Sequence, residues 1–247
     1  MAKVKKRIFA GAVCQQIVYS VSERAPEPTK ARAKKPRFES AEERAEFNRQ
    51  IARRRFARDV NANFTPKGYY STLTIDIEHE VHDFAEAKRL RDNYARRLLR
   101  ACPAGRGYIV MGRGKSTSRI HMHMISEGIP PEVIRAKWGL GEVVDVRPLR
   151  QHNFFDGIDC GQDYTALAYY CFDHWRPEQG GHRYKPFGKL RHAEEEAATE
   201  VHIEYSPTRP PRPPKGYRFV RMEYTRYGYM CFHYVRAPER RGRGKEE

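Results

Sequence analysis

The segment from residue 119 to residue 125, RIHMHMI, alternates between polar and apolar side chains over its first positions. Such alternation is typical of a β-strand, on which successive side chains point to opposite faces of the sheet. The polar face carries Arg119, His121 and His123. The apolar face, which we expect in a core, carries Ile120, Met122 and Met124. Two imidazoles held this way can bind one metal ion, although a strand whose histidines only cover a neighbouring polar surface has the same pattern.

The sequence around this strand predicts a series of strands and helices. Gly68 to Ile77 is rich in β-branched and aromatic residues, and we expect Leu73, Ile75 and Ile77 on one face of a strand. The opposite face would carry Thr72, Thr74 and Asp76. The other predicted elements are an amphipathic helix over 84–101, a strand over 108–111, a turn over 112–118, a helix from 130 to 138, a strand over 142–148, a loop over 153–161, a helix over 162–175 and a basic loop over 180–189.

The two ends of the chain differ from this central part. Residues 8–19 could add a strand or hairpin, and residues 24–36 are rich in Pro and Lys, which is typical of a linker. Ser40 and Glu43 form a capping-box pattern that opens an arginine-rich helix ending near Val60. The C-terminal part is expected to hold a Pro-rich connector over 206–216, a hairpin over 217–235 around Thr225 and Arg226, and a charged tail.

Composition limits the classes of partner. Lys and Arg number 47 against 31 Asp and Glu, so the formal charge is +16, and nucleic acid is the first polyanion to consider. The arginine-rich helix is either a solvated basic face or a phosphate-contacting surface. The 5 cysteines are scattered and never form a Cys-x-x-Cys pair, which argues against a disulfide framework and a structural zinc site. No apolar stretch reaches the ~20 residues of a membrane span, so we expect a soluble protein in a reducing cytoplasm.

Three motifs in this order resemble those of a known family. A threonine-rich strand (STLTID), the His121-Met122-His123 strand and a later helix containing Tyr170 are similar to the HUH endonucleases, which include rolling-circle replication initiators. The likeness is greatest to the filamentous-phage type and related bacterial replication-associated proteins, which continue with a Trp-Gly segment like Trp138-Gly139. It covers roughly residues 65–190.

The resemblance implies both a fold and a reaction. The fold would be α+β: an antiparallel five-stranded palm-like sheet of the ferredoxin/RRM type with helices on one face, plus the N-terminal basic helix and the C-terminal hairpin. His121 and His123 would hold Mg²⁺ or Mn²⁺. Tyr170 would attack a DNA phosphate and form a 5′-phosphotyrosine. A free tyrosine is a poor nucleophile because its pKa is near 10, whereas a metal ion that neutralises the phosphate assists the attack.

The sequence departs from the family pattern at two positions. The strand before the histidine pair reads Met111-Gly112-Arg113 and offers no acidic or amide ligand, so we expect Asp76, or alternatively Glu78, to supply the third metal ligand. Many relatives have a lysine three residues after the tyrosine, where this chain has Asp173. Asp173 or the adjacent His174 lies within one helical turn of Tyr170 and is a further candidate to contact the metal or the tyrosine proton.

These features lead to one main hypothesis and its alternatives. We expect three segments: an N-terminal extension (1–64), a nicking domain (65–190), and a connector with terminal hairpin and tail (191–247). The function would be metal-dependent nicking and joining of single-stranded DNA at a replication origin, initiating rolling-circle replication of a mobile element in a bacterial host. Lys115 and Arg119 would contact the DNA backbone, and host helicase and polymerase are further candidate partners. The alternatives are a single-tyrosine transposase or relaxase, and a catalytically silent nucleic-acid-binding protein.

Overall fold

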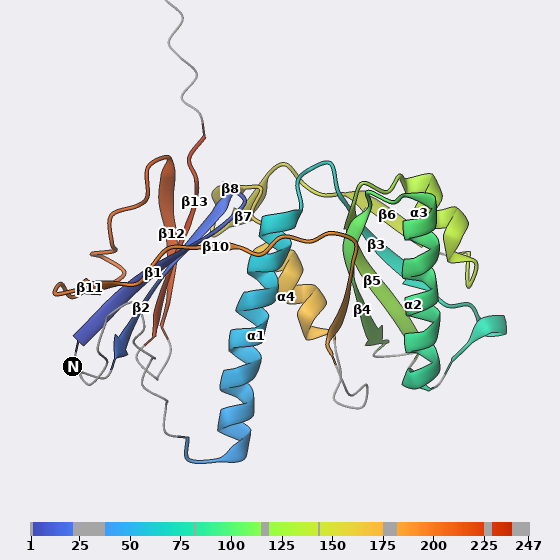
Figure 1. The fold of residues 1–247 in the computed structure, drawn as a ribbon, viewed down its shortest axis with the longest axis horizontal. Coiled ribbons are helices and arrows are strands. Elements are labelled where there is room, and N and C mark those ends of the chain that lie inside the picture. Colours follow the sequence, from blue (N-terminus) through green and yellow to red (C-terminus); the bar gives the residue numbers. More distant parts are fainter. Residues whose placement is uncertain are drawn as a thin grey trace, which may run out of the picture. The chain divides into compact units, whose positions relative to one another are not determined.

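The computed structural model describes residues 2–21, 38–81, 83–114, 119–142, 144–174, 182–224 and 229–238. The chain forms two compact units that interleave along the sequence. Unit 1 comprises Met1–Glu43, His152–Asp163 and Ala193–Glu247, and unit 2 comprises Arg44–Gln151 and Tyr164–His192. The sequence had instead suggested three consecutive segments. The two units are described separately below (Figure 1).

Unit 2 is built on a five-stranded sheet in the order β6-β3-β5-β4-β9, in which every neighbouring pair is antiparallel. Its strands are β3 (Tyr69–Thr74), β4 (Arg106–Arg113), β5 (Ile120–Glu127), β6 (Val144–Pro148) and β9 (Tyr184–Phe187). The first four strands and helices α2 (Phe84–Ala101) and α3 (Pro131–Trp138) follow each other as β-α-β-β-α-β, the ferredoxin-like arrangement. The expected α+β fold with a palm-like antiparallel sheet is therefore confirmed.

One face of this sheet is covered by α2 and α3. The apolar face of β5 packs here, because Met122 and Met124 are fully buried in the same cluster as Leu98 of α2 and Trp138 of α3. The Asp83 side chain caps α2 by accepting a hydrogen bond from the Ala85 backbone N–H, 3.0 Å away. Helix α2 has the bounds that the sequence pattern predicts, and α3 begins one residue later than predicted and ends at Trp138 as expected.

The opposite face is covered by two more helices, α1 (Ala41–Asn63) and α4 (Thr165–Asp173) (Figure 1). Phe56 of α1 and Phe172 of α4 pack with Tyr108 and Val110 of β4 in a second buried cluster. The expected capping hydrogen bond at the start of α1 is present, with the Glu43 N–H 3.1 Å from the Ser40 hydroxyl. The sequence predicted α1 but gave no reason to place it over this face. The position of α4 above the histidines determines the geometry of the site.

Unit 1 contains a six-stranded antiparallel sheet. Its strands are β1 (Ala2–Ala10), β2 (Val13–Val21), β10 (Glu194–Glu195), β11 (Thr199–Val201), β12 (Tyr217–Tyr224) and β13 (Met230–Arg236). The order is β10-β1-β2-β13-β12, and β11 also pairs with β1. The terminal hairpin is thus confirmed as β12 and β13, and the N-terminal segment forms the hairpin β1–β2. The predicted turn at Thr225 and Arg226 and the 24–36 linker lie outside the described residues, as does the charged tail predicted over 237–247 except for its first two residues.

Two segments predicted as loops contain strands. The 153–161 segment is a hairpin of β7 (Asn153–Phe155) and β8 (Ile158–Gly161), whose two-residue turn places Asp156 and Gly157 at φ 46° and 76°. The 180–189 segment contains β9, which pairs with the edge of β4. Both predictions were wrong because such short strands are stabilised by partners that local sequence does not reveal.

All five cysteines are free, as the sequence predicts. Among the described residues, no helix combines the length and apolar character needed to cross a membrane. In unit 2, β3 ends at Thr74, and the chain then enters a short 3₁₀ helix, η1 (Ile77–His79). Ile77 was expected beside Leu73 on a buried strand face, but its side chain is 68% exposed because the strand has ended before it.

Candidate metal centre and tyrosine pocket

The histidine pair lies on β5, near the middle of the unit 2 sheet. Its neighbours in register are Thr72 of β3 opposite His123, and Gly112 of β4 opposite His121. His121 is half-buried, whereas His123 is only 3% exposed because α4 covers this face of the sheet. The sequence predicted the shared face of the two histidines correctly, but the alternation gave no sign that His123 would be buried.

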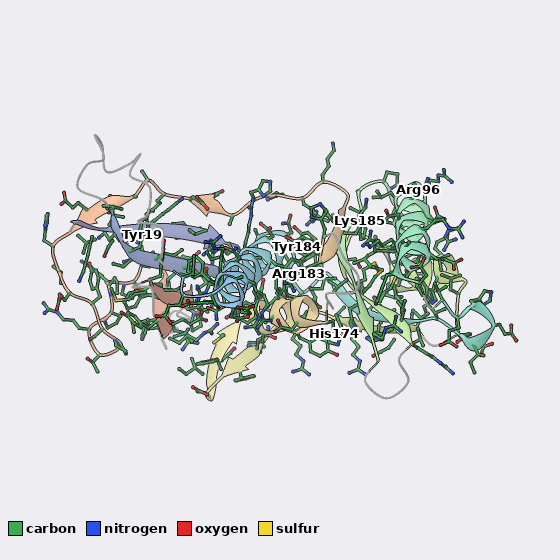
Figure 2. The ribbon with its side chains drawn as sticks, turned by 90° about the horizontal axis from the view of Figure 1, so that it is seen from below. Tyr19, Arg96, His174, Arg183, Tyr184 and Lys185 are labelled. Carbon is green, nitrogen blue, oxygen red and sulfur yellow. The ribbon has the colours of Figure 1, made fainter. Side chains whose placement is uncertain are left out.

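A third histidine completes a compact group. His174 caps the C-terminal end of α4, and its ligand nitrogen lies within 4.8 Å of those of His121 and His123. We call these residues the histidine triad. The rings of His123 and His174 have centroids 4.3 Å apart. Nδ1 of His174 is 2.7 Å from the Tyr170 carbonyl oxygen, so Nδ1–H donates there and Nε2 keeps its lone pair. Figure 2 labels His174 beside the end of α4.

Burial keeps the strand histidines neutral. Loss of hydration, together with smaller effects of the neighbouring His174 and His121, lowers the pKa of His123 to about 3. Burial also lowers the pKa of His121. Among the described residues, His123 Nε2 is a buried atom with no hydrogen-bond partner. Neutral imidazoles with free lone pairs are metal ligands, so the histidine triad could hold a metal ion, and its donor atoms fit this role.

Gly112 leaves the space that the third histidine occupies. A Cβ atom at this position would lie 3.1 Å from His121 Nε2 and 3.2 Å from His174 Cδ2. A larger side chain would therefore press on both rings. The sequence showed that β4 carries no metal ligand at this position. In the structure, the candidate ligand beside Gly112 is His174, at the end of α4.

Asp76, expected as the third ligand, points elsewhere. Its carboxylate Oδ2 accepts a hydrogen bond from the Glu142 N–H at 3.0 Å, and its own N–H donates to the Leu140 carbonyl at 2.9 Å. The Trp138 indole N–H also donates to the Thr74 carbonyl, 2.7 Å away, where β3 ends. These bonds draw the chain after β3 toward the loop that follows α3. Asp76 is not part of the histidine triad, and Glu78 lies on η1, beyond the end of β3.

Tyr170 lies against the histidine triad. Its ring centroid is 4.3 Å from that of His174 and 5.5 Å from that of His123, and the residue is 50% exposed. Tyr169, one position earlier, instead has the Arg53 guanidinium 3.8 Å from its ring centroid. The two tyrosines differ in direction, as expected for neighbours about 100° apart on a helix. Tyr164 is buried, and its hydroxyl donates to the Arg150 carbonyl, so this tyrosine has a packing role.

These groups line a surface pocket of about 830 Å³ in unit 2. Its lining residues are Arg53, Arg113, Gly114, His121, Ala166, Tyr169, Tyr170, Asp173 and His174. The Asp173 carboxylate does not join the histidine triad, because it pairs with two arginines of α1. The distances are 2.9 Å to Arg49 and 2.7 Å to Arg53. The pocket therefore combines possible metal ligands, a phenol and guanidinium groups, all of which suit an anionic ligand.

The two residues predicted to contact DNA have different outcomes. Arg119 immediately precedes β5, where its side chain is 37% exposed and lies 3.7 Å from the Glu80 carboxylate. It is thus near the site but already paired. Lys115 lies outside the described residues. Arg53 belongs to the arginine-rich helix that the sequence offered as a phosphate-contacting surface, whereas Arg113 was not predicted to contact DNA. Their presence in one pocket depends on how α1 and β4 pack.

Comparison of the chain with protein-family models, with curated proteins and with solved structures found no match. The interpretation of the site therefore depends on its own geometry.

Proposed function

We propose that this protein is a metal-dependent enzyme that nicks and rejoins single-stranded DNA, with Tyr170 as the nucleophile, and that it initiates rolling-circle replication of a mobile element. The observation that carries the proposal is the packing of Tyr170 against the histidine triad, beside a pocket that Tyr170, His121 and His174 line. The antiparallel sheet with the histidine pair near its middle, and the tyrosine helix across it, agrees with the arrangement that the HUH resemblance implies.

In the proposed reaction, the Tyr170 oxygen attacks a phosphodiester phosphorus. The bond from phosphorus to the 3′ oxygen breaks, which leaves a 3′-hydroxyl and a 5′-phosphotyrosine. The phenolic proton leaves as the new P–O bond forms, and the departing 3′ oxygen takes up a proton. Because one phosphoester replaces another, the reverse attack by a 3′-hydroxyl rejoins the strand without an added energy source.

The histidine triad supplies the metal site of this proposal. A bound divalent ion would neutralise charge on a non-bridging phosphate oxygen. His121, His123 and His174 all offer imidazole nitrogen, which suits transition metals better than Mg²⁺, an ion that prefers oxygen ligands. Of the two ions that the HUH resemblance suggests, we therefore propose Mn²⁺.

Arginines are the proposed phosphate-positioning groups. Arg53, from α1, and Arg113, from β4, line the pocket. The Arg53 guanidinium is paired with Asp173 at 2.7 Å and that of Arg113 lies 4.9 Å from the Phe84 ring centroid, so an incoming phosphate would take over these contacts. Guanidinium groups bind phosphate oxygens in pairs and remain charged at any physiological pH. They would take the part of the lysine that many relatives have near the tyrosine, because Asp173 at that position cannot contact a phosphate favourably.

The decisive experiment is detection of the covalent adduct. The full chain is incubated with Mn²⁺ and a pool of random-sequence single-stranded oligonucleotides labelled at the 3′ end, which is the part that a 5′-phosphotyrosine retains. We expect a labelled protein band that survives denaturation, and a modified peptide that maps to Tyr170. Tyr170→Phe should abolish the band, whereas the matched control Tyr169→Phe should keep it.

Two outcomes would contradict the proposal. One is the absence of any adduct with the wild-type chain at every Mn²⁺ concentration tested. The other is an adduct that persists in Tyr170→Phe or maps to Tyr169. Retained binding of the oligonucleotide pool without an adduct would favour the alternative of a catalytically silent binding protein.

A further inference from the structure

A second tyrosine contacts the buried histidine. The Tyr70 hydroxyl of β3 lies 2.6 Å from His123 Nδ1, and the two rings are stacked with an interplanar angle of 15°. Tyr70 also packs edge-on against Tyr170, with ring centroids 6.4 Å apart. Tyr70 is thus in contact with both a residue of the histidine triad and the tyrosine on α4.

The hydrogen-bond directions around Tyr70 follow from a count of protons. A neutral imidazole carries one proton on its two nitrogens. His123 Nε2 is the nitrogen without a partner, so a metal ion would bind there and the proton would lie on Nδ1. Nδ1–H then donates to the Tyr70 oxygen. The phenol keeps one proton of its own, which it must donate to another acceptor.

The candidate acceptor is the Tyr170 hydroxyl, because the Tyr170 ring lies edge-on to that of Tyr70, with centroids 6.4 Å apart, and the two side chains hydrogen-bond. The oxygen of Tyr70 can accept two hydrogen bonds. Its donors are His123 Nδ1–H and the Thr72 hydroxyl, whose oxygen is 3.5 Å away. A neutral phenol carries one proton, so it can accept from one side and donate to the other.

We propose that Tyr70 is a positioning residue that couples the histidine triad to Tyr170, a role that rests on the function proposed above. With the triad loaded, Tyr70 accepts from His123 and donates to the Tyr170 oxygen. This fixes the direction in which His123 presents Nε2, and it orients the Tyr170 hydroxyl toward the pocket. Without metal, His123 is free to take the other tautomer, and Tyr70 then donates to Nδ1 instead of to Tyr170.

The test uses Tyr70→Phe in the full chain, which removes one oxygen and keeps the ring. Tyr69→Phe is the matched control, because it makes the same change one residue earlier, where the side chain packs against the opposite face of the sheet. Mn²⁺ affinity is measured by titration calorimetry with the metal alone. The reactivity of Tyr170 is measured, with and without Mn²⁺, by the rate of acetylation with N-acetylimidazole, read by peptide mass spectrometry.

We expect Tyr70→Phe to weaken Mn²⁺ binding by about 10-fold or more, the usual effect of removing a hydrogen-bond partner of a ligating histidine. In the wild type and in Tyr69→Phe, Mn²⁺ should change the acetylation rate of Tyr170 several-fold. In Tyr70→Phe, this dependence on Mn²⁺ should be lost or greatly reduced.

The coupling is overturned if Tyr70→Phe binds Mn²⁺ within two-fold of the wild type and keeps the same metal dependence of acetylation. The coupling is also overturned if Mn²⁺ leaves the acetylation rate of Tyr170 unchanged in the wild type. This measurement does not depend on whether any variant folds. Neither readout involves DNA. A wild type that forms no DNA adduct, but shows both expected effects, would contradict the nicking function and leave the coupling standing.

Discussion

The contact between Asp173 and the arginines of α1 gives a prediction whose size can be worked out. Asp173→Asn removes the negative charge and keeps the shape of the side chain. It breaks two ion pairs, at 2.9 Å to Arg49 and 2.7 Å to Arg53, which join α4 to α1. The pair partners are 32–39% exposed, so water screens both interactions. Exposed ion pairs are worth about 0.2–1 kcal/mol each, so we expect a loss of about 1 kcal/mol in the free energy of unfolding.

The assay is thermal unfolding at two salt concentrations. For a chain of this size, a loss of about 1 kcal/mol lowers Tm by about 2–4 °C. The difference from wild type should shrink in 1 M NaCl, where the Debye length falls to about 3 Å from about 10 Å at 0.1 M. Because His174 follows Asp173 at the end of α4, loosening of this turn should also weaken Mn²⁺ binding.

Glu46→Gln is the matched control. Glu46 pairs with the same Arg49 at 2.8 Å, but within α1 and without a link to α4. It should change Tm less than Asp173→Asn does, and it should leave Mn²⁺ affinity unchanged. The reasoning is refuted if Asp173→Asn destabilises the protein equally at both salt concentrations, or if Glu46→Gln weakens Mn²⁺ binding as much as Asp173→Asn.

Two further predictions concern the histidine triad. Gly112→Ala places a methyl group within 3.2 Å of His121 and His174, so it should weaken Mn²⁺ binding in a calorimetric titration, while the free energy of unfolding changes by less than about 1 kcal/mol. His123 has a folded-state pKa of about 3, below its unfolded value near 6.5, so its contribution to stability is present above pH 6.5 and is lost as pH falls toward 3. Chemical denaturation across this range should show a flatter pH dependence for His123→Asn than for the wild type; equal slopes would contradict the assignment.

Local patterns in the sequence were sufficient for the elements that form the sheet and one helix layer. The alternation around His121 and His123 gave the shared face of the pair, and the apolar spacing gave α2 with its observed bounds. The capping box at Ser40 gave the start of α1. These features depend on neighbours a few residues apart, which sequence patterns record directly.

Long-range contacts account for the parts that the sequence did not give. Alternation alone continued this strand as far as Ile77, but the Trp138 indole bond to the Thr74 carbonyl and the bonds of Asp76 divert the chain earlier. The burial of His123 depends on α4, which is more than 40 residues away along the chain. The sequence signal for the third histidine was its spacing from Tyr170, because residues one helical turn apart lie on the same side of a helix. This signal did not decide between His174 and Asp173 as the further candidate ligand.

The change of ligand from carboxylate to imidazole has an electrostatic consequence for the proposed reaction. A carboxylate ligand would cancel part of the charge of a bound divalent ion, whereas three neutral imidazoles cancel none of it. Asp173, the acidic side chain in the pocket lining, is itself paired with Arg49 and Arg53. The full positive charge of a bound ion would then be available to an incoming phosphate. Gly112 leaves room for His174. In the proposed site, the protein's metal ligands would therefore all be neutral, and the phosphodiester would supply the negative charge.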